Sequence, residues 1–445
     1  MSDLLARDRR VFWHPCTQMT DHDLVPPIEV VGAEGVHLHL ADGRRLIDGI
    51  SSWWCKSLGH RHPRLIRALT DQAGRFEHVI AANTVQEPTV RLCERLLAIH
   101  PGRWGRVFLA GDGSTGIEIA LKMAVQWQRQ RGQPGRTRFA GLEDGYHGET
   151  IATMSVSDCG VFRAPFDDLC FDATVLTGLP RRSGPEDPRW LDASAEWPAI
   201  ERQLETIAPT LAGVVVEPVL QGAGGMRLIS PDLLRRMAAW CRAHGVLLIA
   251  DEIAAGSGRC GAWLASSLGG DEALPDLAVL SKGLTGGVLP LCAVLIPEAI
   301  AQAFEAPWIE GRAFLHSNTY TGHALACAVA NEVLSVYEDD DILGRVARHG
   351  PRLRQGLAAL GGPHLQGVRG VGMMAAADLV SADGTPFPRE RRTGWRCFQA
   401  ALRRGALLRS LGDTVYLLPP LITEPADQDR LLAILADSVA EAVRD

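Results

Sequence analysis

The hydrophobic residues of this chain follow two different repeats. From about Arg106 onward, short apolar runs alternate with longer stretches in which apolar residues recur every three or four positions. Short runs predict buried strands and the longer repeat predicts helices, so this region favours an α/β fold, with a mostly parallel mixed sheet flanked by helices. We expect its strands at residues 106–110, 137–143, 213–217, 246–251, 277–281 and 291–296.

The two ends of the chain show other patterns. Before about Asp48, apolar and polar residues alternate on either side of Asp42 and Gly43, which is typical of a β-hairpin. Near the other end, we expect a helix at 323–337 and strands at 367–375 and 414–418. We therefore predict a large domain at 60–330 and a small α+β domain formed by 1–59 together with 331–445. The Pro-, Arg- and Asp-rich segment 178–196 predicts a surface loop.

Composition and charge restrict the class of protein. Of the 445 residues, 46% are hydrophobic and 22% charged, which excludes low-complexity and mostly disordered chains. A net charge of −7 without a basic tract argues against nucleic-acid and membrane-surface partners. The longest apolar run, 288–297, is too short to span a bilayer, and the first ten residues do not resemble a secretory signal. Ten scattered cysteines without metal-ligand spacing indicate a reducing compartment, so we expect a cytoplasmic protein without a metal.

A glycine-rich segment, 111–116, follows one predicted strand and opens a predicted helix at 117–131. Free N–H groups and the helix dipole at such a position bind anions, and phosphate is the usual ligand. The spacing also matches G-x-G-x-x-G, with Glu143 at the end of the next strand, so a dinucleotide site stays open. A glycine-rich turn without a ligand is the third interpretation.

Two charged residues end neighbouring predicted strands. Asp251 ends the apolar run 246–250, and Lys282 follows the strand at 277–281, so the two side chains emerge at one edge of the sheet, where open α/β sheets bind ligands. A buried ion pair would explain them equally well. The chain has only three lysines, at 56, 122 and 282, against 42 arginines, which favours a role that guanidinium cannot perform. With a phosphate cradle, this carboxylate and amine are the groups that pyridoxal 5′-phosphate requires.

Several other side chains are candidates for contact with a cofactor or substrate. Tyr146 lies in a predicted turn where its ring can stack on a planar group, or it is an ordinary loop tyrosine. Trp53 and Trp54 cannot both face one core if the segment is extended, so one is expected in an apolar pocket. Arg409 is able to hold a carboxylate with two hydrogen bonds, although most of the 42 arginines lie on the surface.

These segments, taken in order, resemble the class-III aminotransferases, which are fold-type-I pyridoxal-phosphate enzymes. The resemblance covers nearly the whole chain and rests on Gly113-Ser114, Tyr146-His147-Gly148, Asp251-Glu252-Ile253, Ser281-Lys282-Gly283 and Thr319. A further set is similar to the members that act in biotin synthesis and pass an amino group from S-adenosylmethionine to 8-amino-7-oxononanoate. This set comprises Trp13-His14-Pro15, Ser51-Ser52-Trp53-Trp54 and the segments 221–226, 284–287 and 416–420.

The resemblance implies a role for each matching residue. Lys282 would form the Schiff base and move the proton, Asp251 would hold the pyridine nitrogen, Gly113 and Ser114 would bind phosphate, and Tyr146 would cover the ring and touch substrate. Asn318 and Thr319 would reach the cofactor of a neighbouring subunit, which implies a homodimer with shared active sites. Substrate contacts would come from Trp53, Trp54, Ser317, Arg409 and the position of Cys16.

Two departures from the family pattern and three rival functions remain. Cys16 stands where many members have a tyrosine, and Ser317-Asn318 replaces a common Gly-Pro; both affect the substrate pocket. A class-III aminotransferase with another ω-amino substrate would keep all the cofactor residues. A nicotinamide-dependent dehydrogenase would use 111–116 but leave Asp251 and Lys282 without a task. A cofactor-sensing module of a regulator would need a DNA-binding domain, for which no segment is left.

Overall fold

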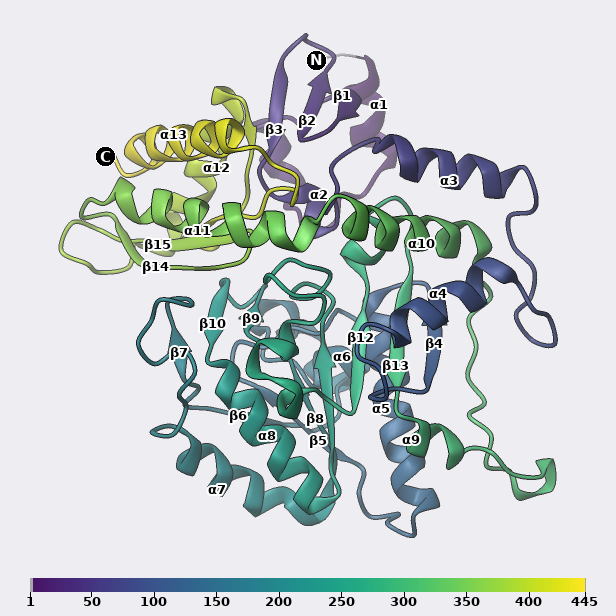
Figure 1. Ribbon diagram of the computed structural model, residues 1–445. Coiled ribbons are helices and arrows are strands. Elements are labelled where there is room, and N and C mark those ends of the chain that lie inside the picture. Colours follow the sequence, from purple (N-terminus) through teal and green to yellow (C-terminus); the bar gives the residue numbers. More distant parts are fainter. Residues whose placement is uncertain (1–2, 445) are drawn as a thin grey trace.

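A seven-stranded sheet lies at the centre of the larger part of the computed structural model, which describes residues 3–444 (Figure 1). Its strand order is β4-β13-β12-β11-β8-β5-β6. Only β13 runs antiparallel to its neighbours, so the predicted mostly parallel mixed sheet is confirmed. The strands are β4 (Arg106–Ala110), β5 (Arg138–Leu142), β6 (Thr174–Leu176), β8 (Leu211–Val216), β11 (Leu247–Asp251), β12 (Leu277–Leu280) and β13 (Cys292–Ile296).

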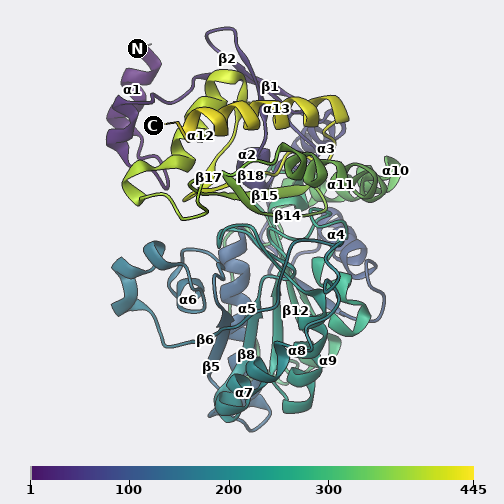
Figure 2. The ribbon, with the colours of Figure 1, turned by 90° about the vertical axis from the view of Figure 1, so that its left-hand side faces the viewer.

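Helices cover both faces of this sheet because its central strands are apolar on both sides. Every residue of β8, β11, β12 and β13 is buried. Leu247 and Ile249 pack with α5 (Gly113–Gln130), whereas Leu248 and Ala250 pack with α8 (Pro231–His244). Figure 2 shows the sheet between these two helices. The same part of the chain also contains α4 (Glu87–Leu97), α6 (Ile151–Ser155), α7 (Trp197–Ile207) and α9 (Glu298–Gln302).

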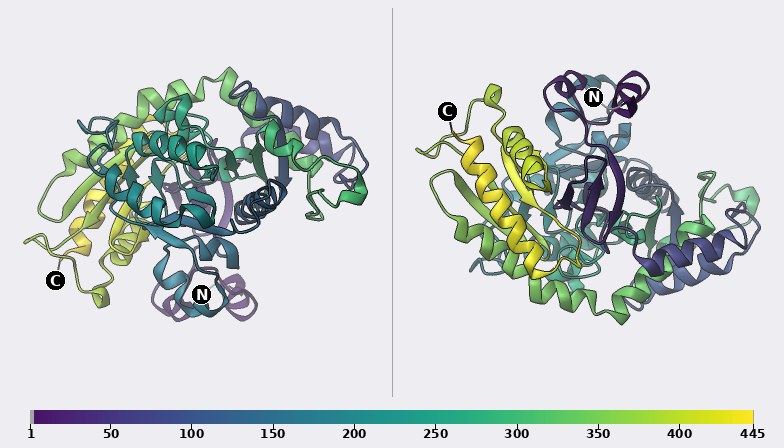
Figure 3. Two further views of the ribbon diagram at one scale, coloured as in Figure 1. Left: turned by 90° about the horizontal axis from the view of Figure 1, so that it is seen from below. Right: turned by 90° about the horizontal axis from the view of Figure 1, so that it is seen from above.

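Residues from both ends of the chain form the smaller part. Its first sheet has the order β1-β2-β3-β16, and β16 (Ala406–Leu407) pairs in parallel with β3 (Arg45–Asp48). The right view of Figure 3 shows the N-terminal strands beside the C-terminal helices. The remaining elements are β1 (Val30–Glu34), β2 (His37–Leu40), β14 (Leu365–Val371), β15 (Met374–Leu379), β17 (Ser410–Leu411), β18 (Thr414–Leu417), α1 (Asp3–Val11), α11 (Ile342–Leu360), α12 (Thr393–Arg404) and α13 (Pro425–Ala442).

Helices α3 (Pro63–Ala73) and α10 (Ala324–Asp339) lie where the two parts of the chain meet (Figure 1). The predicted domain boundary at residue 330 falls inside α10. The division into domains at these residues stays a prediction. Between residues 3 and 444, the structure has no helix that is long and apolar enough to cross a membrane.

Two local expectations were wrong. The apolar run 367–375 is not one strand, because the chain reverses at Gly372, whose φ is +52°, and joins β14 to β15. Segment 178–196 is not only a surface loop. It contains β7 (Arg181–Arg182), which pairs with β10 (Arg227–Ile229), and it buries Trp190 and Ala193. The segment is mostly polar, so its composition did not predict that a few of its apolar residues are buried.

Candidate active site

The amino-terminal end of α5 offers two backbone donors to an anion. Thr115 donates its N–H to the side chain of Asp112 at 2.9 Å, and Gly116 donates to the Asp112 carbonyl at 3.1 Å. The N–H groups of Gly113 and Ser114 are therefore the two of the first turn that remain for a ligand. A Cβ added to Gly148 would lie 2.1 Å from Ser114 Oγ, so the following loop closes tightly over this end of the helix.

Asp251 lies at the carboxyl end of β11 and is 4% exposed. Its Oδ2 is 2.8 Å from Nδ1 of His147, and its Oδ1 accepts the N–H of Ile253 at 3.1 Å. Within residues 3–444 it forms no ion pair with Lys282, so the simple Asp–Lys pair considered from the sequence is wrong. A buried carboxylate that is paired on one side in this way is suited to holding a protonated ring nitrogen.

Glu217 is a buried carboxyl behind the site that sequence reasoning did not identify. It accepts the N–H of Tyr146 and that of Gly222, both at 2.9 Å. Burial is the main cause that raises its pKa to about 7; the nearby Asp251 acts in the same direction, while His147 and the two backbone donors oppose the shift. The sequence held a signal, because Glu217 ends a predicted strand in the same way as Asp251.

Lys282 follows β12 in a strained backbone conformation with φ +40°. Its Nζ lies 5.0 Å from the centre of the Trp54 ring. Removal of the amine from water lowers its pKa below the ordinary value of 10.5, although the Asp251 and Glu217 carboxylates oppose this shift. A lowered pKa increases the fraction of neutral amine, which is the nucleophilic form.

Tyr146 is partly buried in the loop after β5, as predicted, and its hydroxyl donates to Glu149 Oε1 at 3.0 Å. Burial and the Glu149 carboxylate both raise the Tyr146 pKa, so the phenol stays protonated. The exposed Cys16 lies with its Sγ 4.0 Å from the same Glu149 oxygen. Burial and Glu149 raise the Cys16 pKa, whereas Arg409 lowers it, which places all four side chains in one neighbourhood.

The two tryptophans lie in a left-handed turn, labelled α2 (Ser51–Trp54) in Figure 1. The φ angles of these four residues are +50°, +43°, +74° and +72°, and none is glycine. Such backbone costs about 1–2 kcal/mol per residue, so surrounding contacts must stabilise it. The turn points the two rings to different groups: Trp54 lies beside Lys282, and the centre of the Trp53 ring lies 4.8 Å from Cζ of Arg409.

Further contacts fix Trp54 between the two parts of the chain. Its Nε1 donates to the hydroxyl of Tyr416 at 3.1 Å, and a Cβ added to Gly222 would lie 2.7 Å from its ring. Trp53 is 49% exposed, and Arg409 lies between β16 and β17. The structure therefore connects Trp53 to Arg409, Arg409 to Cys16 and, through Glu149, Cys16 to Tyr146, while Trp54 lies beside Lys282.

Ser317, Asn318 and Thr319 lie in the loop before α10, away from this group. The adjacent His316 has its Nδ1 2.8 Å from Nζ of Lys122 on α5. Among the described residues, Ser317, Asn318 and Thr319 have no hydrogen bond or ion pair with Lys282, Asp251 or Tyr146. The side chain of Asn318 lies beside the His316 ring and raises the pKa of that imidazole, against the larger lowering effects of burial and Lys122.

These residues fit pyridoxal 5′-phosphate. Two free N–H groups suit its phosphate, a buried carboxylate suits its ring nitrogen, and an amine with a lowered pKa suits its aldehyde. The dehydrogenase considered above would leave the paired Asp251 and the partly buried Lys282 without a function.

Three comparisons with known proteins agree with this assignment. Residues 18–439 match the family model for aminotransferase class III. The chain is 41% identical, over 96% of its length and 98% of the relative, to an adenosylmethionine-8-amino-7-oxononanoate aminotransferase from Synechococcus elongatus. A crystal structure of the enzyme of that name from Methanocaldococcus jannaschii has a TM-score of 0.91 at 30% identity, covering 98% of both chains. A PLP-bound amine transaminase from an uncultivated Pseudomonas species has a TM-score of 0.88 at 32% identity, covering 97% and 98%.

Proposed function

This chain belongs to the class-III aminotransferases, and we propose that it transfers the amino group of S-adenosylmethionine to 8-amino-7-oxononanoate, giving 7,8-diaminononanoate for biotin synthesis. The observation that carries this choice is the position of Arg409 over the Trp53 ring, 4.8 Å from its centre. Both substrates have a carboxylate, for which a guanidinium on an aromatic face is a suitable partner.

Pyridoxal 5′-phosphate is the cofactor of the family. When bound, it supplies an electron-withdrawing ring that takes an amino group from one substrate and gives it to the next. Gly113 and Ser114 would hold its phosphate through their backbone N–H groups, Tyr146 would cover its ring, and Asp251 would bind its ring nitrogen. The His147 contact, at 2.8 Å, would keep the Asp251 carboxylate in place.

Lys282 would hold the cofactor and move the proton during transfer. Its lowered pKa makes the neutral amine available, and its position beside Trp54 keeps it away from water. The phenol of Tyr146 stays protonated because burial and Glu149 raise its pKa, so it does not act as a base, and since its proton is donated to Glu149 its oxygen is left to accept a hydrogen bond from substrate. One pocket accepts both substrates in turn, and ping-pong kinetics follow.

The substrate side would include Trp53, Trp54, Tyr146, Arg409, Cys16 and, from a second subunit, Ser317. Cys16 shares Glu149 with Tyr146, so we place this exposed thiol at the entrance of the proposed substrate pocket. A thiol is smaller than a phenol ring and leaves more room there. We infer that Cys16 widens the entrance without changing the cofactor side.

We also propose that the active unit is a homodimer in which Asn318 and Thr319 complete the site of the partner. Exposed apolar side chains gather on the loop before α4 and the loop before α10, and they include Val79, Ile80, Val85 and Tyr320. These loops lie side by side, because the rings of His78 and Tyr320 are 5.2 Å apart. The cytoplasmic location stays a prediction, with which the ten free cysteines agree.

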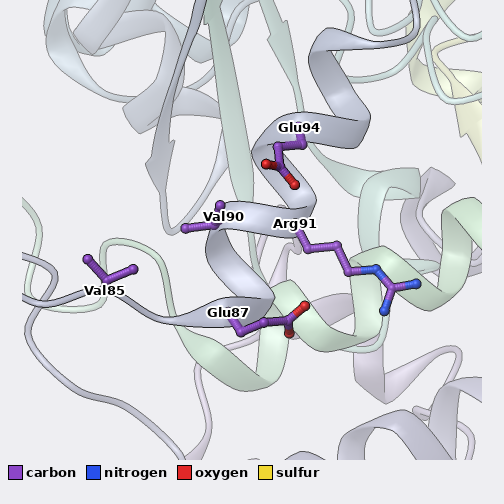
Figure 4. A pocket seen from close by; sticks show the side chains of 5 residues that line it. All are labelled: Val85, Glu87, Val90, Arg91 and Glu94. Atoms are coloured by element: carbon purple, nitrogen blue, oxygen red, sulfur yellow. The ribbon is translucent and has the colours of Figure 1, made fainter.

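The charges on α4 suit contact with a second copy of this surface. Figure 4 shows a hollow lined by Val85, Glu87, Val90, Arg91 and Glu94. Among the lining residues, Glu87 and Glu94 stand on either side of Arg91 in the sequence of the helix, so a twofold axis through this face would pair Arg91 of each copy with a glutamate of the other. The apolar loops and the complementary charges together support the dimer.

Mixing two inactive variants tests the shared site. In a hybrid of Lys282→Ala with Asn318→Ala, one site has both defects and the other has neither. Mixed and re-equilibrated subunits should therefore regain about a quarter of wild-type activity if each variant alone is inactive. The two variants at the same total concentration, kept unmixed, are the control. No recovery despite hybrid formation, seen by native mass spectrometry, would mean that each chain completes its own site.

Product analysis tests the reaction itself. The purified protein is incubated with 8-amino-7-oxononanoate and single amino donors, and 7,8-diaminononanoate is measured by mass spectrometry. We expect product with S-adenosylmethionine. Product only with another amine donor, or transfer only to other acceptors, would instead support the ω-amino aminotransferase alternative. The neighbouring amine transaminase keeps the same fold, so fold alone does not separate these two functions.

A further inference from the structure

The left-handed turn that presents Trp53 and Trp54 is fixed by one buried carboxylate. Asp48, at the end of β3, is 0% exposed. Its Oδ1 accepts the N–H of Ile50 at 3.3 Å and that of Ser52 at 3.0 Å. Its Oδ2 accepts the hydroxyl of Ser52 at 2.7 Å. Three donors from the entry to the turn thus converge on this side chain.

The ring of His60 is the fourth group that contacts this carboxylate, after the two backbone N–H groups and the Ser52 hydroxyl. Its Nε2 lies 2.9 Å from Asp48 Oδ2 and 3.5 Å from Ser52 Oγ, and the residue is 9% exposed. The backbone of His60 exchanges two hydrogen bonds with Gly35, at 2.7 and 3.0 Å. His60 therefore connects the turn to the residues that link β1 and β2. Its ring holds Asp48 from the side opposite the backbone donors.

The turn has a second support that does not depend on Asp48. Ser51 Oγ donates to the carbonyl of Leu418 at 2.7 Å and accepts from Arg259 at 3.2 Å. Loss of Asp48 would therefore not release the segment completely. It would remove the contacts to Ser52, which directly precedes Trp53, and so change the direction in which the Trp53 ring points, whereas Trp54 is still held by Tyr416 and by packing on Gly222.

We propose that Asp48 and His60 are positioning residues for substrate, acting through the turn at Ser52 on Trp53 and its neighbour Arg409. The proposal rests on the proposed substrate role of Trp53 and Arg409. The cofactor side does not share these supports, because Asp251, His147 and Glu217 are fixed to β5, β8 and β11 and to the loops that follow them. Substrate affinity should therefore depend on Asp48 and His60, and cofactor attachment should not.

Steady-state kinetics of Asp48→Asn test this separation. The amide has the same size but places an N–H2 group among four donors, so it loses at least two of the contacts. We expect KM for each substrate to rise roughly 10- to 100-fold while kcat changes less than about threefold, because the lost interaction acts on binding. The visible absorption band of the cofactor and its content per subunit should stay as in the wild type.

Matched variants separate positioning from a loss of stability. Asp276 is a second carboxylate that accepts a backbone N–H, from Leu248 at 2.9 Å, but it lies at the start of β12, at the end of the sheet opposite the site. Asp276→Asn should leave both KM values within about twofold of the wild type. His60→Gln keeps a donor toward Asp48 and should raise KM less than His60→Ala. Ser52→Ala removes one hydroxyl and should raise KM about three- to tenfold, which keeps a test available if Asp48→Asn does not fold.

Three results would overturn the proposal. Unchanged KM in Asp48→Asn and Ser52→Ala would show that the turn keeps its direction without these contacts. A fall in kcat and cofactor content with unchanged KM would place the effect on the cofactor side. Equal effects in Asp276→Asn would indicate general destabilisation. If the wild type uses a different amino donor, the proposed choice of S-adenosylmethionine is wrong. The same comparison of KM values, made with that donor, still tests the role of Asp48 and His60.

Discussion

The cofactor side and the substrate side of this site are built from different kinds of structure. On the cofactor side, Asp251 and Lys282 follow adjacent parallel strands, and the phosphate end is the first turn of an 18-residue helix. On the substrate side, Cys16, Trp53 and Arg409 come from an N-terminal loop, a strained turn and a short link between two-residue strands. The cofactor side is positioned by strand ends and a helix start, with Lys282 in a strained turn directly after its strand, whereas the substrate side is positioned by irregular backbone throughout.

The difference suggests how one fold serves many substrates. A shift of β11 or β12 would disturb a sheet whose central strands are fully buried, so the cofactor side has little freedom to vary. The substrate side contains exposed residues such as Trp53 and Cys16. Substitutions at such positions do not disturb the packing of the core. Mutations on the two sides should therefore have different kinetic signatures.

Lys282→Ala should have the largest effect. Lys282 follows the strand beside that of Asp251 and its amine has a lowered pKa, and guanidinium is too basic to replace it, so turnover should fall by at least about 10⁴-fold. The measurement is single-turnover product formation, together with peptide mapping of the wild-type cofactor adduct after borohydride reduction. An adduct on Lys56 or Lys122, or substantial turnover by Lys282→Ala, would refute the assignment.

Asp251→Asn should keep the fold and some bound cofactor while losing about 100-fold or more in kcat. The amide has no charge to stabilise a protonated ring nitrogen, and it loses the paired contact with His147 at 2.8 Å. Steady-state kinetics and the absorption band of the bound cofactor measure both effects. A near-normal kcat would show that another group holds the ring nitrogen.

Arg409→Ala should act on the substrate side and affect both half-reactions. A guanidinium–carboxylate contact in a partly desolvated site contributes roughly 2–4 kcal/mol, so kcat/KM should fall about 30- to 1000-fold for each substrate. Lysine should restore little, because it lacks the planar fork and stacks less well on Trp53. Each substrate is varied in turn: a loss for one substrate alone refutes the shared clamp, and no loss refutes the site.

Glu217→Gln tests the residue that connects the two sides, since it binds both Tyr146 and Gly222. The Glu217 pKa of about 7 in the folded state lies above the ordinary 4.5, so the free energy of unfolding of the wild type falls as pH rises from about 4.5 to about 7. Between pH 5 and pH 8 this free energy should fall by on the order of 1–3 kcal/mol more in the wild type than in the variant, because glutamine does not titrate. Thermal unfolding at both pH values measures the difference, and parallel pH curves would contradict the assigned pKa.

Sequence patterns located the cofactor side better than the substrate side. The strand at 106–110 was predicted at its observed bounds, and those ending near Asp251 and Lys282 lie within one residue of β11 and β12, because long apolar runs bounded by polar residues have few alternative structures. The turn at 51–54 was not predictable. Four consecutive non-glycine residues with positive φ contradict local preference, and the nearby Asp48 stabilises them together with distant partners such as Leu418 and Tyr416.

Single residues show the same limit. Glu217 ends a predicted strand, but nothing in its neighbourhood of the sequence indicates that it binds the backbone of Tyr146, 71 residues away. The motifs also did not predict that Ser317, Asn318 and Thr319 lie apart from Lys282. The order of motifs along a chain does not show whether a residue contributes to its own active site or to that of a second subunit.

The pairing of β3 with β16 affects the order of folding during synthesis. Ser51 and Leu418 are 367 residues apart, and Trp54 and Tyr416 are 362 apart, so these contacts form only after nearly the whole chain has left the ribosome. The central sheet, whose strands end at Ile296, has no such requirement. A nascent chain would therefore complete its cofactor-binding edge while the N-terminal hairpin still lacks a neighbouring strand. A chain that ends before Tyr416 would lack the contacts of Tyr416 and Leu418 with the tryptophan turn.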